Sequence, residues 1–308
     1  MTYDCIIIGG GIAGLQAAIQ LGRYVTHQIL VIDSGSGRST LCRNYHNILG
    51  WPDGISGEEL RNRGKAQAVS LGVKFVQDKV ARAAKQDQLF ELAGEQGVRY
   101  QAKTVLLATG LMDRLPDIPG IRRTLGRSVY VCPDCDGYEI HNRKTVVMGS
   151  GNSGANMALL LAEQASEVIF INHEQQAVDA EILMKIKDRR IRYIETGISR
   201  VLEEQDGMIQ SVILEDGTVI PAERGFIGFG GNQVHSELAE QLGAKLYPNK
   251  HVEADPRSRM TNTQNLWIAG DLGVHAEQVT VSMGDGTLAA ISIHKVLREL
   301  KRAQEVNL

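Results

Sequence analysis

The sequence of 308 residues contains only four cysteines, and their spacing is irregular. This excludes a secreted scaffold held together by disulfides, because such scaffolds are short and dense in cysteine. The length is sufficient for two domains whose buried cores need neither disulfides nor metals. Only Cys132 and Cys135 lie close together, so the composition predicts a reducing compartment and one working pair of thiols.

Long apolar runs and blocks of like charge are also missing. No stretch approaches the roughly 18 uninterrupted apolar residues of a membrane helix, and the first residues lack the pattern of a signal peptide. Lys and Arg total 33 against 36 Asp and Glu, and no basic cluster stands out. We therefore expect a soluble, cytoplasmic protein that binds neither membranes nor nucleic acids.

A glycine-rich turn follows the first apolar run of the chain. The turn carries Gly9, Gly11 and Gly14. Residues 5–8 before it are expected to form a strand, a helix follows, and a second strand over 29–32 ends at Asp33. Such glycines let the backbone approach a pyrophosphate at the helix N-terminus, and the acid accepts a hydrogen bond from a ribose hydroxyl. The pattern predicts a dinucleotide site.

The next segment predicts a helix over 55–71 and a small antiparallel excursion. Its short strands are expected at 74–76, 80–84, 89–93 and 98–100. A buried strand over 104–107 then ends in the small residues Ala108, Thr109 and Gly110, which allow a cofactor to approach the backbone closely. The densest proline cluster, at 115–120, predicts a domain boundary, with a plain surface loop as the alternative.

A second glycine-rich turn lies about 140 residues after the first. It carries Gly149, Gly151, Asn152, Ser153 and Gly154. A strand is expected before it over 144–148, a helix after it, and another strand over 168–171. The repeated architecture indicates two nucleotide-binding domains rather than a short solenoid repeat. Near the end, a buried strand over 266–269 ends at Gly270 and Asp271, before a helix expected from 278 to 300.

Just before the second turn lies a Cys-x-x-Cys motif, formed by Cys132 and Cys135 and followed by Asp136. At this spacing the two sulfurs can lie within bonding distance at a turn. A structural zinc is not expected, because it normally takes four ligands and the remaining candidates, Cys42 and His46, lie far upstream. An idle buried pair is the other alternative.

The order and spacing of these landmarks, over nearly the whole chain, resemble the low-molecular-weight thioredoxin reductase family of flavoproteins. The resemblance implies that FAD binds the first domain. Its pyrophosphate would lie at the first glycine turn, its adenosine ribose on Asp33 and its ribityl chain near Asp271. Gln278 and Val279 would present helix N-terminal amides to the flavin, and Asn47 is a weaker match to a flavin-contacting asparagine.

The same resemblance assigns the catalytic roles. Cys135 would face the flavin, Cys132 would exchange with the substrate disulfide, and Asp136 would act as general acid. The partner would be a thioredoxin-like protein or a small thiol or disulfide substrate, and the chain would form a homodimer. The family also implies that the inserted domain rotates, so 116–120 and 228–231 are candidate hinges.

The chain departs from this family at the second site. Where NADPH-dependent members carry arginines that hold the 2′-phosphate, this sequence has Asn172, His173, Glu174 and Val178. The missing charge-assisted contacts, each worth about 1.5 to 3 kcal/mol, and the repulsion from Glu174 argue against NADPH. The second site would then take NADH, read by His173 or Glu174, or a second FAD. Alternatively it binds nothing, and electrons arrive from a ferredoxin-type protein.

Two other functions stay open. The segment after Cys135 is also similar to gliotoxin-type dithiol oxidases, which use FAD and oxygen, although those usually place a histidine where Asp136 stands. A non-catalytic flavin redox sensor is the alternative from a different class. The expected fold is α/β with two Rossmann-like domains of the three-layer ββα type, and no metal. Residues 1–115 and 241–308 would form the FAD domain, and 116–240 the inserted nucleotide-binding domain with the cysteine pair.

Overall fold

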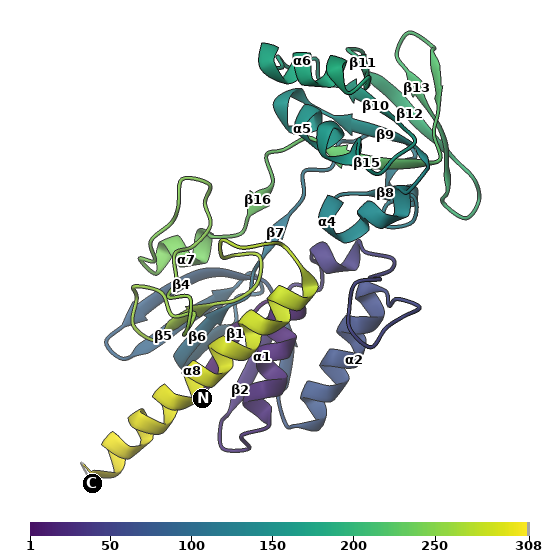
Figure 1. The fold of residues 1–308 in the computed structure, drawn as a ribbon. Helices are drawn as coiled ribbons and strands as arrows, with labels where there is room; N and C mark the ends of the chain where they lie inside the picture. The colour runs from purple at the N-terminus through teal and green to yellow at the C-terminus, as the bar shows by residue number, and fades with distance from the viewer. Residues whose placement is uncertain (307–308) are drawn as a thin grey trace. The chain divides into compact units, whose positions relative to one another are not determined.

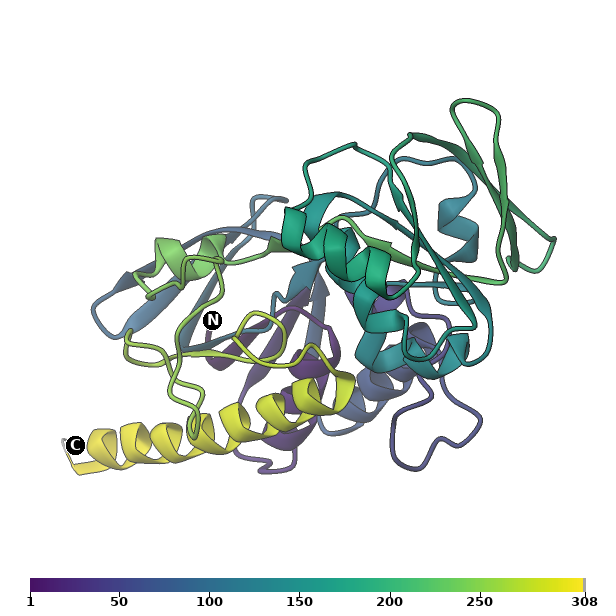
Figure 2. The same cartoon turned by 45° about the horizontal axis from the view of Figure 1, so that its top comes forward.

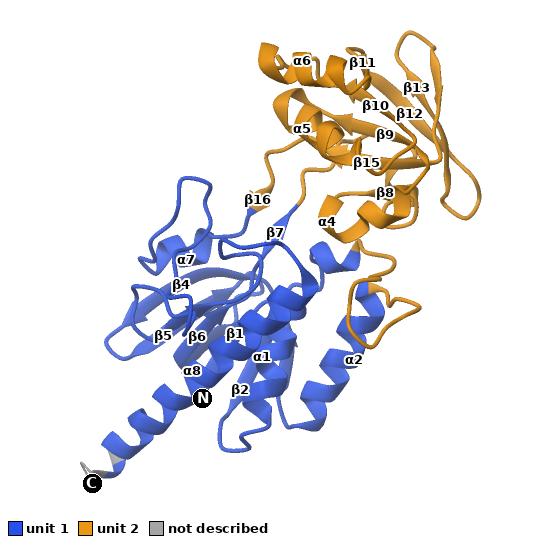
Figure 3. Ribbon diagram, viewed as in Figure 1, with its two compact units in different colours: residues 1–40, 57–112, 234–308 blue, residues 41–56, 113–233 orange. Residues whose placement is uncertain are grey.

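The computed structural model describes residues 1–306, and the chain divides into two compact units (Figure 3). Unit 1 comprises residues 1–40, 57–112 and those from 234 on, and unit 2 comprises residues 41–56 and 113–233. The chain thus leaves unit 1 twice and returns to it twice. Short strands β7 (Leu111–Met112) and β16 (Gln233–Val234) pair with each other at the second exit and return.

Unit 1 is built on one seven-stranded sheet (Figure 1). Its strands are β1 (Thr2–Ile8), β2 (Ile29–Asp33), β3 (Lys74–Gln77), β4 (Val80–Gln86), β5 (Leu89–Gly94), β6 (Arg99–Leu107) and β17 (Leu266–Ile268). The strands β3, β2, β1, β6 and β17 run parallel, and β5 and β4 continue from β6 as antiparallel neighbours. The carboxyl ends of β1, β6 and β17 therefore lie at one edge, where ligands of such sheets bind.

Helices cover one face of this sheet. They are α1 (Ile12–Gly22), α2 (Gly57–Ser70) and α8 (Val279–Val306), and Figures 1 and 2 show α1 and α8 side by side. Alternate strand residues such as Cys5 and Ile7 pack against them. The intervening residues Ile6 and Ile8 pack on the other face, against β4, β5 and α7 (Glu237–Gln241). Both faces are buried, which explains why the central strands are continuous apolar runs.

Unit 2 repeats this arrangement with a five-stranded parallel sheet. Its order is β11 (Arg192–Ile194), β10 (Glu167–Asn172), β9 (Lys144–Gly149), β15 (Arg224–Gly228) and β8 (Val129–Tyr130). The helices α5 (Gly151–Leu161) and α6 (Ala180–Asp188) cover one face, packing on Val147 and Phe170. The antiparallel strands β12 (Ile198–Glu203), β13 (Ile209–Leu214) and β14 (Val219–Pro221) cover the other. The predicted α/β class is confirmed.

The short elements of the chain complete this inventory. They are the helical turns η1 (Arg38–Thr40) and η2 (Gly137–Ile140) and the helices α3 (Ile121–Thr124) and α4 (Pro133–Asp136). The cysteine motif therefore forms one turn of helix. The last helix, α8, continues past the expected end at residue 300.

Two strand predictions are wrong in detail. The segments 98–100 and 104–107 form one strand, β6, because β1 pairs with it continuously from Gln101 to Leu107, while its two halves have different neighbours on the other edge. Its first half pairs with β5 (Leu92 with Tyr100), and its second half pairs with β17 (Leu266 with Val105). The strand at 74–76 is not part of the antiparallel excursion, since β3 pairs in parallel with β2.

Segment 41–56, which the sequence places in the first domain, groups with unit 2. One reason is a close backbone contact, because a Cβ on Gly126 would lie 2.7 Å from Arg43 N and 2.9 Å from Leu41 O. The domain boundaries predicted after residues 115 and 240 stay predictions for the cofactor-binding domains.

Both predicted hinges lie inside unit 2 rather than at its borders. The N–H of Val201 donates to Pro119 O at 2.8 Å, and a Cβ on Gly120 would lie 2.1 Å from Val201 O. Similarly, a Cβ on Gly230 would lie 2.4 Å from Ser153 Oγ. These contacts tie both segments to other parts of unit 2, whose borders with unit 1 lie after residues 112 and 233, and the hinge assignment stays a prediction.

Candidate active site

The first glycine turn connects β1 to α1 and is closed on one side and open on the other. A Cβ on Gly9, whose φ is +106°, would lie 2.3 Å from Ala108 O, and one on Gly14 would lie 1.9 Å from Gly9 O. A Cβ on Gly11 would meet no atom within 4 Å. Gly9 and Gly14 are thus needed for backbone packing, whereas Gly11 leaves space over the N-terminus of α1.

Asp33 ends β2 beside this turn. One carboxylate oxygen accepts a hydrogen bond from the N–H of Gly10 at 3.0 Å, and the other lies 2.9 Å from Arg61 Nη2, on α2. The Asp33 side chain is 23 % exposed, so it can still be reached by a ligand hydroxyl. Its charge is held in place from two directions.

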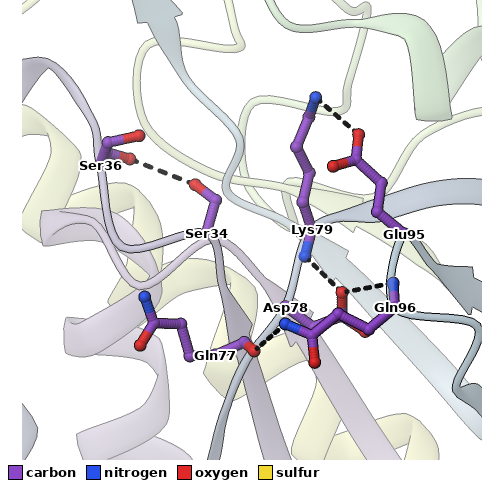
Figure 4. A pocket seen from close by; sticks show the side chains of 7 residues that line it. All are labelled: Ser34, Ser36, Gln77, Asp78, Lys79, Glu95 and Gln96. Carbon is purple, nitrogen blue, oxygen red and sulfur yellow. Dashed lines mark hydrogen bonds and ion pairs between the residues drawn. The ribbon is translucent and has the colours of Figure 1, made fainter.

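A polar cavity of about 400 Å³ opens just beyond Asp33 (Figure 4). It is lined by Ser34, Ser36, Gln77, Asp78, Lys79, Glu95 and Gln96. Asp78 accepts hydrogen bonds from the N–H groups of Lys79 at 2.8 Å and Gln96 at 3.4 Å, and its own N–H donates to Asp33 O at 3.1 Å. The cavity wall is therefore fixed to the end of β2.

Thr109 and Gly110 follow β6 at the same edge of the sheet. The hydroxyl of Thr109 donates to His235 O at 2.7 Å, and the N–H of His235 donates to Gly110 O at 3.0 Å. Gly110 has φ of +62°, and a Cβ there would meet no atom within 4 Å. The segment is held firmly but leaves its backbone uncovered at Gly110.

Gly270 and Asp271 follow β17, the third parallel strand at this edge. A Cβ on Gly270, whose φ is +73°, would lie 2.9 Å from Ala13 Cβ, so the segment touches the first turn of α1. Asp271 accepts a hydrogen bond from Ser282 Oγ at 3.2 Å and lies 3.3 Å from Arg38 Nη1. The same Arg38 nitrogen lies 2.6 Å from Glu277 Oε2.

The predicted residues Gln278 and Val279 lie at the start of α8. Val279 is the first residue of the helix, and Gln278 precedes it and accepts a hydrogen bond from the N–H of Ser282 at 2.9 Å. The structure thus brings the predicted first-site residues together in unit 1, with one exception. Asn47 is exposed and belongs to unit 2.

The two cysteines of the motif form a disulfide in unit 2. The Cα atoms of Cys132 and Cys135 are 5.3 Å apart. Cys132 caps α4, and its Sγ accepts a hydrogen bond from the N–H of Cys135 at 3.2 Å, while Pro133 opens the helix. Proline favours this position because its φ is already helical. The sequence therefore folds locally so that both sulfurs lie on one side.

Asp136 follows the disulfide directly and is partly buried. Burial, together with the nearby charge of Glu139, raises the pKa of the Asp136 carboxyl to about 7. Burial also raises the pKa of Tyr130, which lies near both acids. At neutral pH, Asp136 is thus close to half protonated and can donate or accept a proton.

The second glycine turn connects β9 to α5 and differs from the first in being covered. Gly149 and Gly154 are closely packed like Gly9 and Gly14, since their Cβ atoms would lie 2.6 Å from Gly228 O and 2.4 Å from the Phe170 ring. A Cβ on Gly151 would lie 3.2 Å from Gln176 Cβ, whereas its counterpart Gly11 faces open space. The loop after β10 therefore lies over this turn.

The polar side chains predicted for the second site bond to other residues of unit 2. Asn172, which is fully buried, accepts from the N–H of Gly151 at 3.0 Å and donates to Gln176 O at 2.8 Å. Asn152 Nδ2 donates to Asp179 Oδ2 at 2.9 Å, and the Asp179 N–H donates to Asn152 Oδ1 at 2.9 Å.

His173 and Glu174 are held in the same way. His173 Nδ1 accepts the N–H of Ile198 at 2.7 Å. Glu174 forms an ion pair with Arg114. Burial opposes ionisation of Glu174, but hydrogen bonds from Ser150 and Arg114 lower its pKa, so it stays charged.

Several residues at these sites escape sequence reasoning. Arg61, Arg38 and Arg114 each pair with an acid far away in the sequence, and Asp179 pairs with Asn152 across a loop. The sequence signal for Arg61 is its place on the predicted helix after Asp33. No local pattern indicates the others.

A family model described as pyridine nucleotide-disulphide oxidoreductase matches residues 3–286. The chain belongs to this family. A thioredoxin reductase of Rickettsia bellii (strain RML369-C) is 28% identical over 313 residues, covering 97% of this chain and 99% of that protein. A thioredoxin reductase of Treponema pallidum (strain Nichols) is 30% identical over 298 residues, covering 94% of this chain and 95% of that protein.

Solved structures have the same fold over nearly the whole chain. The crystal structure of HlmI has a TM-score of 0.90 and 26% identity, covering 99% of this chain and 96% of that one. The putative thioredoxin reductase TrxB from Bacillus anthracis has a TM-score of 0.85 and 26% identity, covering 97% and 99%. The chain is a flavin disulfide oxidoreductase of the thioredoxin reductase type, with two dinucleotide-binding domains. FAD is the flavin typical of this family.

Two features are absent from the part of the chain that the structure describes. No helix within residues 1–306 is long and apolar enough to cross a membrane. No group of three or more His, Cys, Asp or Glu side chains in those residues is arranged to hold a metal ion.

Proposed function

We propose that this protein exchanges electrons between bound FAD and a thiol or disulfide substrate through the Cys132–Cys135 pair, and that NADPH is not its donor. The observation that carries the proposal is the formed disulfide directly followed by Asp136, whose raised pKa suits proton transfer near neutral pH. The open first glycine turn supports the flavin part of the proposal.

The first-site residues fit FAD. The space over Gly11 suits a diphosphate at the N-terminus of α1, and Asp33 suits the adenosine ribose. The cavity beyond Asp33 suits the adenine end, Asp271 the ribityl chain, and Gln278 and Val279 the ring. The bound flavin would supply a two-electron store for the cysteine pair.

At the cysteine pair, a substrate dithiol is oxidised to a disulfide while the Cys132–Cys135 disulfide is reduced. A substrate thiolate attacks Cys132 Sγ, a bond forms between these sulfurs, and the Cys132–Cys135 bond breaks. Asp136 gives its proton to the departing Cys135 thiolate. The second substrate thiolate then displaces Cys132, so the substrate leaves oxidised and the pair is left reduced. Run backwards, the same steps reduce a substrate disulfide.

The second glycine turn argues against a nicotinamide donor. Asn172 stands where an acid would accept a ribose hydroxyl, and its side chain is buried and hydrogen-bonded. Glu174 repels a 2′-phosphate, and its cationic partner Arg114 is already neutralised. Among the donors that the sequence leaves open, NADH, a second FAD or a ferredoxin-type protein, this cover favours the protein donor.

We propose that this protein is a cytoplasmic homodimer and that its partner is a thioredoxin-like protein or a small thiol. Support for the thioredoxin class comes from the relatives named as thioredoxin reductases. A dithiol oxidase that passes electrons from FAD to oxygen is the second candidate. The covered second turn also favours this oxidase, because its electrons come from the dithiol substrate and it needs no nicotinamide nucleotide.

The test begins with the purified full-length chain. Its flavin is extracted and counted, and bleaching of the flavin band is followed on adding NADH, NADPH or a dithiol. We expect one FAD per chain, bleaching by the dithiol, and slow or no bleaching by NADPH. Cys132→Ser and Cys135→Ser should abolish dithiol bleaching, while Cys42→Ser is the matched control and should not. A colourless protein, or fast bleaching by NADPH, would contradict the proposal.

Steady-state turnover separates the remaining alternatives. With a dithiol substrate, continuous oxygen consumption indicates the oxidase, and turnover that needs a reduced electron-carrier protein and a disulfide indicates the reductase. A redox sensor would react once per chain and then stop. That stoichiometric outcome would overturn the catalytic proposal while leaving the flavin assignment intact.

A further inference from the structure

A buried cluster of three charged side chains lies under the segment that joins β17 to α8. Arg259 and Asp285 are 8 % and 7 % exposed, and His275 lies beside them. Asp285 Oδ2 is 2.7 Å from Arg259 Nη2 and 2.8 Å from His275 Nε2, and it accepts the N–H of Gly270 at 3.3 Å. One carboxylate oxygen thus ties together three parts of unit 1.

The two ring nitrogens of His275 both face oxygen atoms. Nε2 faces Asp285 Oδ2, and Nδ1 lies 2.8 Å from Ala276 O. A neutral imidazole carries one N–H, so the lone pair of its other ring nitrogen would point at an oxygen and repel it. Only the imidazolium donates on both sides. The geometry therefore favours a protonated His275.

The charges around His275 support this state. Its hydrogen bond to Asp285 raises the pKa of His275, against the opposing effect of its burial, and the other charged group that faces it is Arg259. With His275 protonated, the cluster holds two cations and one anion. It therefore carries net positive charge in a site that is shielded from water, where charge acts most strongly.

This charge lies close to the proposed flavin site. Gly270, which the cluster holds through Asp285, packs against Ala13 at the start of α1 and is followed by Asp271. The segment therefore belongs to the edge where β1, β6 and β17 end and where the glycine turn begins. Residues 270–278 are fixed at one end by Gly270 and in the middle by His275.

We propose that His275 is a positioning residue that keeps its proton at neutral pH, fixes the 270–278 segment against α8, and stabilises the negative charge of the reduced flavin. The inference rests on the proposed FAD site. It assigns a role to a histidine outside the cysteine motif and outside both glycine turns. It also predicts that the flavin's reduction potential senses the charge of this ring.

The first measurement concerns the ring itself and does not depend on turnover. The full chain with its flavin is labelled with ¹⁵N-histidine, and the His275 signals are assigned with His275→Gln. We expect both nitrogens to be protonated at pH 7. A neutral His275 at that pH in the flavin-bound protein would overturn the proposal. A protein that binds no flavin would instead contradict the proposed function.

The second measurement is the flavin potential. His275→Gln should lower the ratio of reduced to oxidised flavin about tenfold at a fixed solution potential, equivalent to about 30 mV for two electrons. His275→Lys, which keeps the charge, should recover most of this shift. His141→Gln, which changes an exposed histidine of unit 2, is the control and should leave the ratio unchanged.

The pH dependence of the parent potential covers the case in which a variant does not fold. While His275 keeps its proton it stabilises the reduced flavin, and this stabilisation is lost as pH rises through the raised pKa of His275 in the folded protein. The parent potential should fall more steeply with pH in that range than outside it. A potential with no such inflection, or equal potentials in the parent and His275→Gln, would show that the ring is a structural contact only.

Discussion

Asn152 and Asp179 hold each other by two hydrogen bonds, each residue donating to the other at 2.9 Å. Asn152 is in the first turn of α5, and Asp179 immediately precedes α6. The pair therefore fastens the loop after β10 across the second glycine turn. In the first turn, the position equivalent to the covered Gly151 faces open space. Two turns with the same glycine spacing thus differ in what can reach them.

We expect that cover to keep nucleotides out. Adding NADH or NADPH to the parent chain should leave amide hydrogen exchange in residues 149–154 unchanged. Asp179→Ala should speed exchange there and cost about 1 kcal/mol of unfolding free energy, since it removes a side-chain hydrogen bond. Asp188→Ala, at the exposed end of α6, is the matched control. If NADH slowed amide exchange of residues 149–154 in the parent, the loop after β10 would not keep nucleotides from this turn.

Substitutions of two glycines in the first turn should separate binding from folding. Gly11→Ala adds a methyl group in open space, so the fold should stay stable while flavin content falls more than tenfold. Gly14→Ala adds one 1.9 Å from Gly9 O and should destabilise the chain by about 3 kcal/mol or more.

Extracted flavin per chain and thermal unfolding measure these two effects. Gly284→Ala, within α8, meets no atom within 4 Å and should change neither. If Gly11→Ala kept its full flavin content, the diphosphate assignment at this turn would be wrong.

The proton held by Asp136 should be visible in the pH profile of disulfide opening. Because protonated Asp136 is the donor, the rate of Cys132–Cys135 reduction should fall as pH rises through about 7. Rapid mixing with a low-pKa dithiol keeps the thiolate fraction of the substrate constant. Asp136→Asn should slow the reaction about 100-fold or more and remove this limb. If the rate of Asp136→Asn still fell through about pH 7, another group would be the proton donor. Asp134→Asn, which changes an exposed neighbour, should keep the pH dependence of the parent.

A histidine pair in unit 1 should make stability depend on pH. His27 Nε2 and His294 Nδ1 are 2.8 Å apart, and His294 stacks on Tyr24 with ring centroids 3.7 Å apart. Burial lowers the pKa of both histidines, and their mutual repulsion lowers that of His27 further. Because the folded pKa values are depressed, the stabilisation is present above pH 6.5 and is lost as pH falls through the folded values.

Thermal unfolding between pH 5 and 8 measures this effect. His294→Gln should flatten the decline below pH 6.5 relative to the parent. The exposed substitution His141→Gln should leave the slope as it is. Equal slopes in the parent and His294→Gln would mean that the pair does not control acid stability.

Local patterns predicted much of this molecule. The positions of Gly9, Gly14 and Asp33 can be predicted from the sequence, because a dinucleotide turn depends on neighbours within one strand, turn and helix. The Cys132–Cys135 pair is readable because its geometry is set within four residues. By contrast, the merging of 98–100 with 104–107 into β6 depends on pairing with β1, which lies far earlier in the chain.

The sequence by itself determined the α/β class, the two glycine turns, the redox pair and the run Asn172, His173 and Glu174 after the second turn, since each is written in contiguous residues. Only the tertiary structure decided that the first turn is open and the second covered, and that Arg61, Arg38 and Arg114 meet their acids. It also placed Asp285 between Arg259 and His275. The physical reason is that charge pairing and access depend on which distant segments fold against each other, and no local spacing encodes that contact.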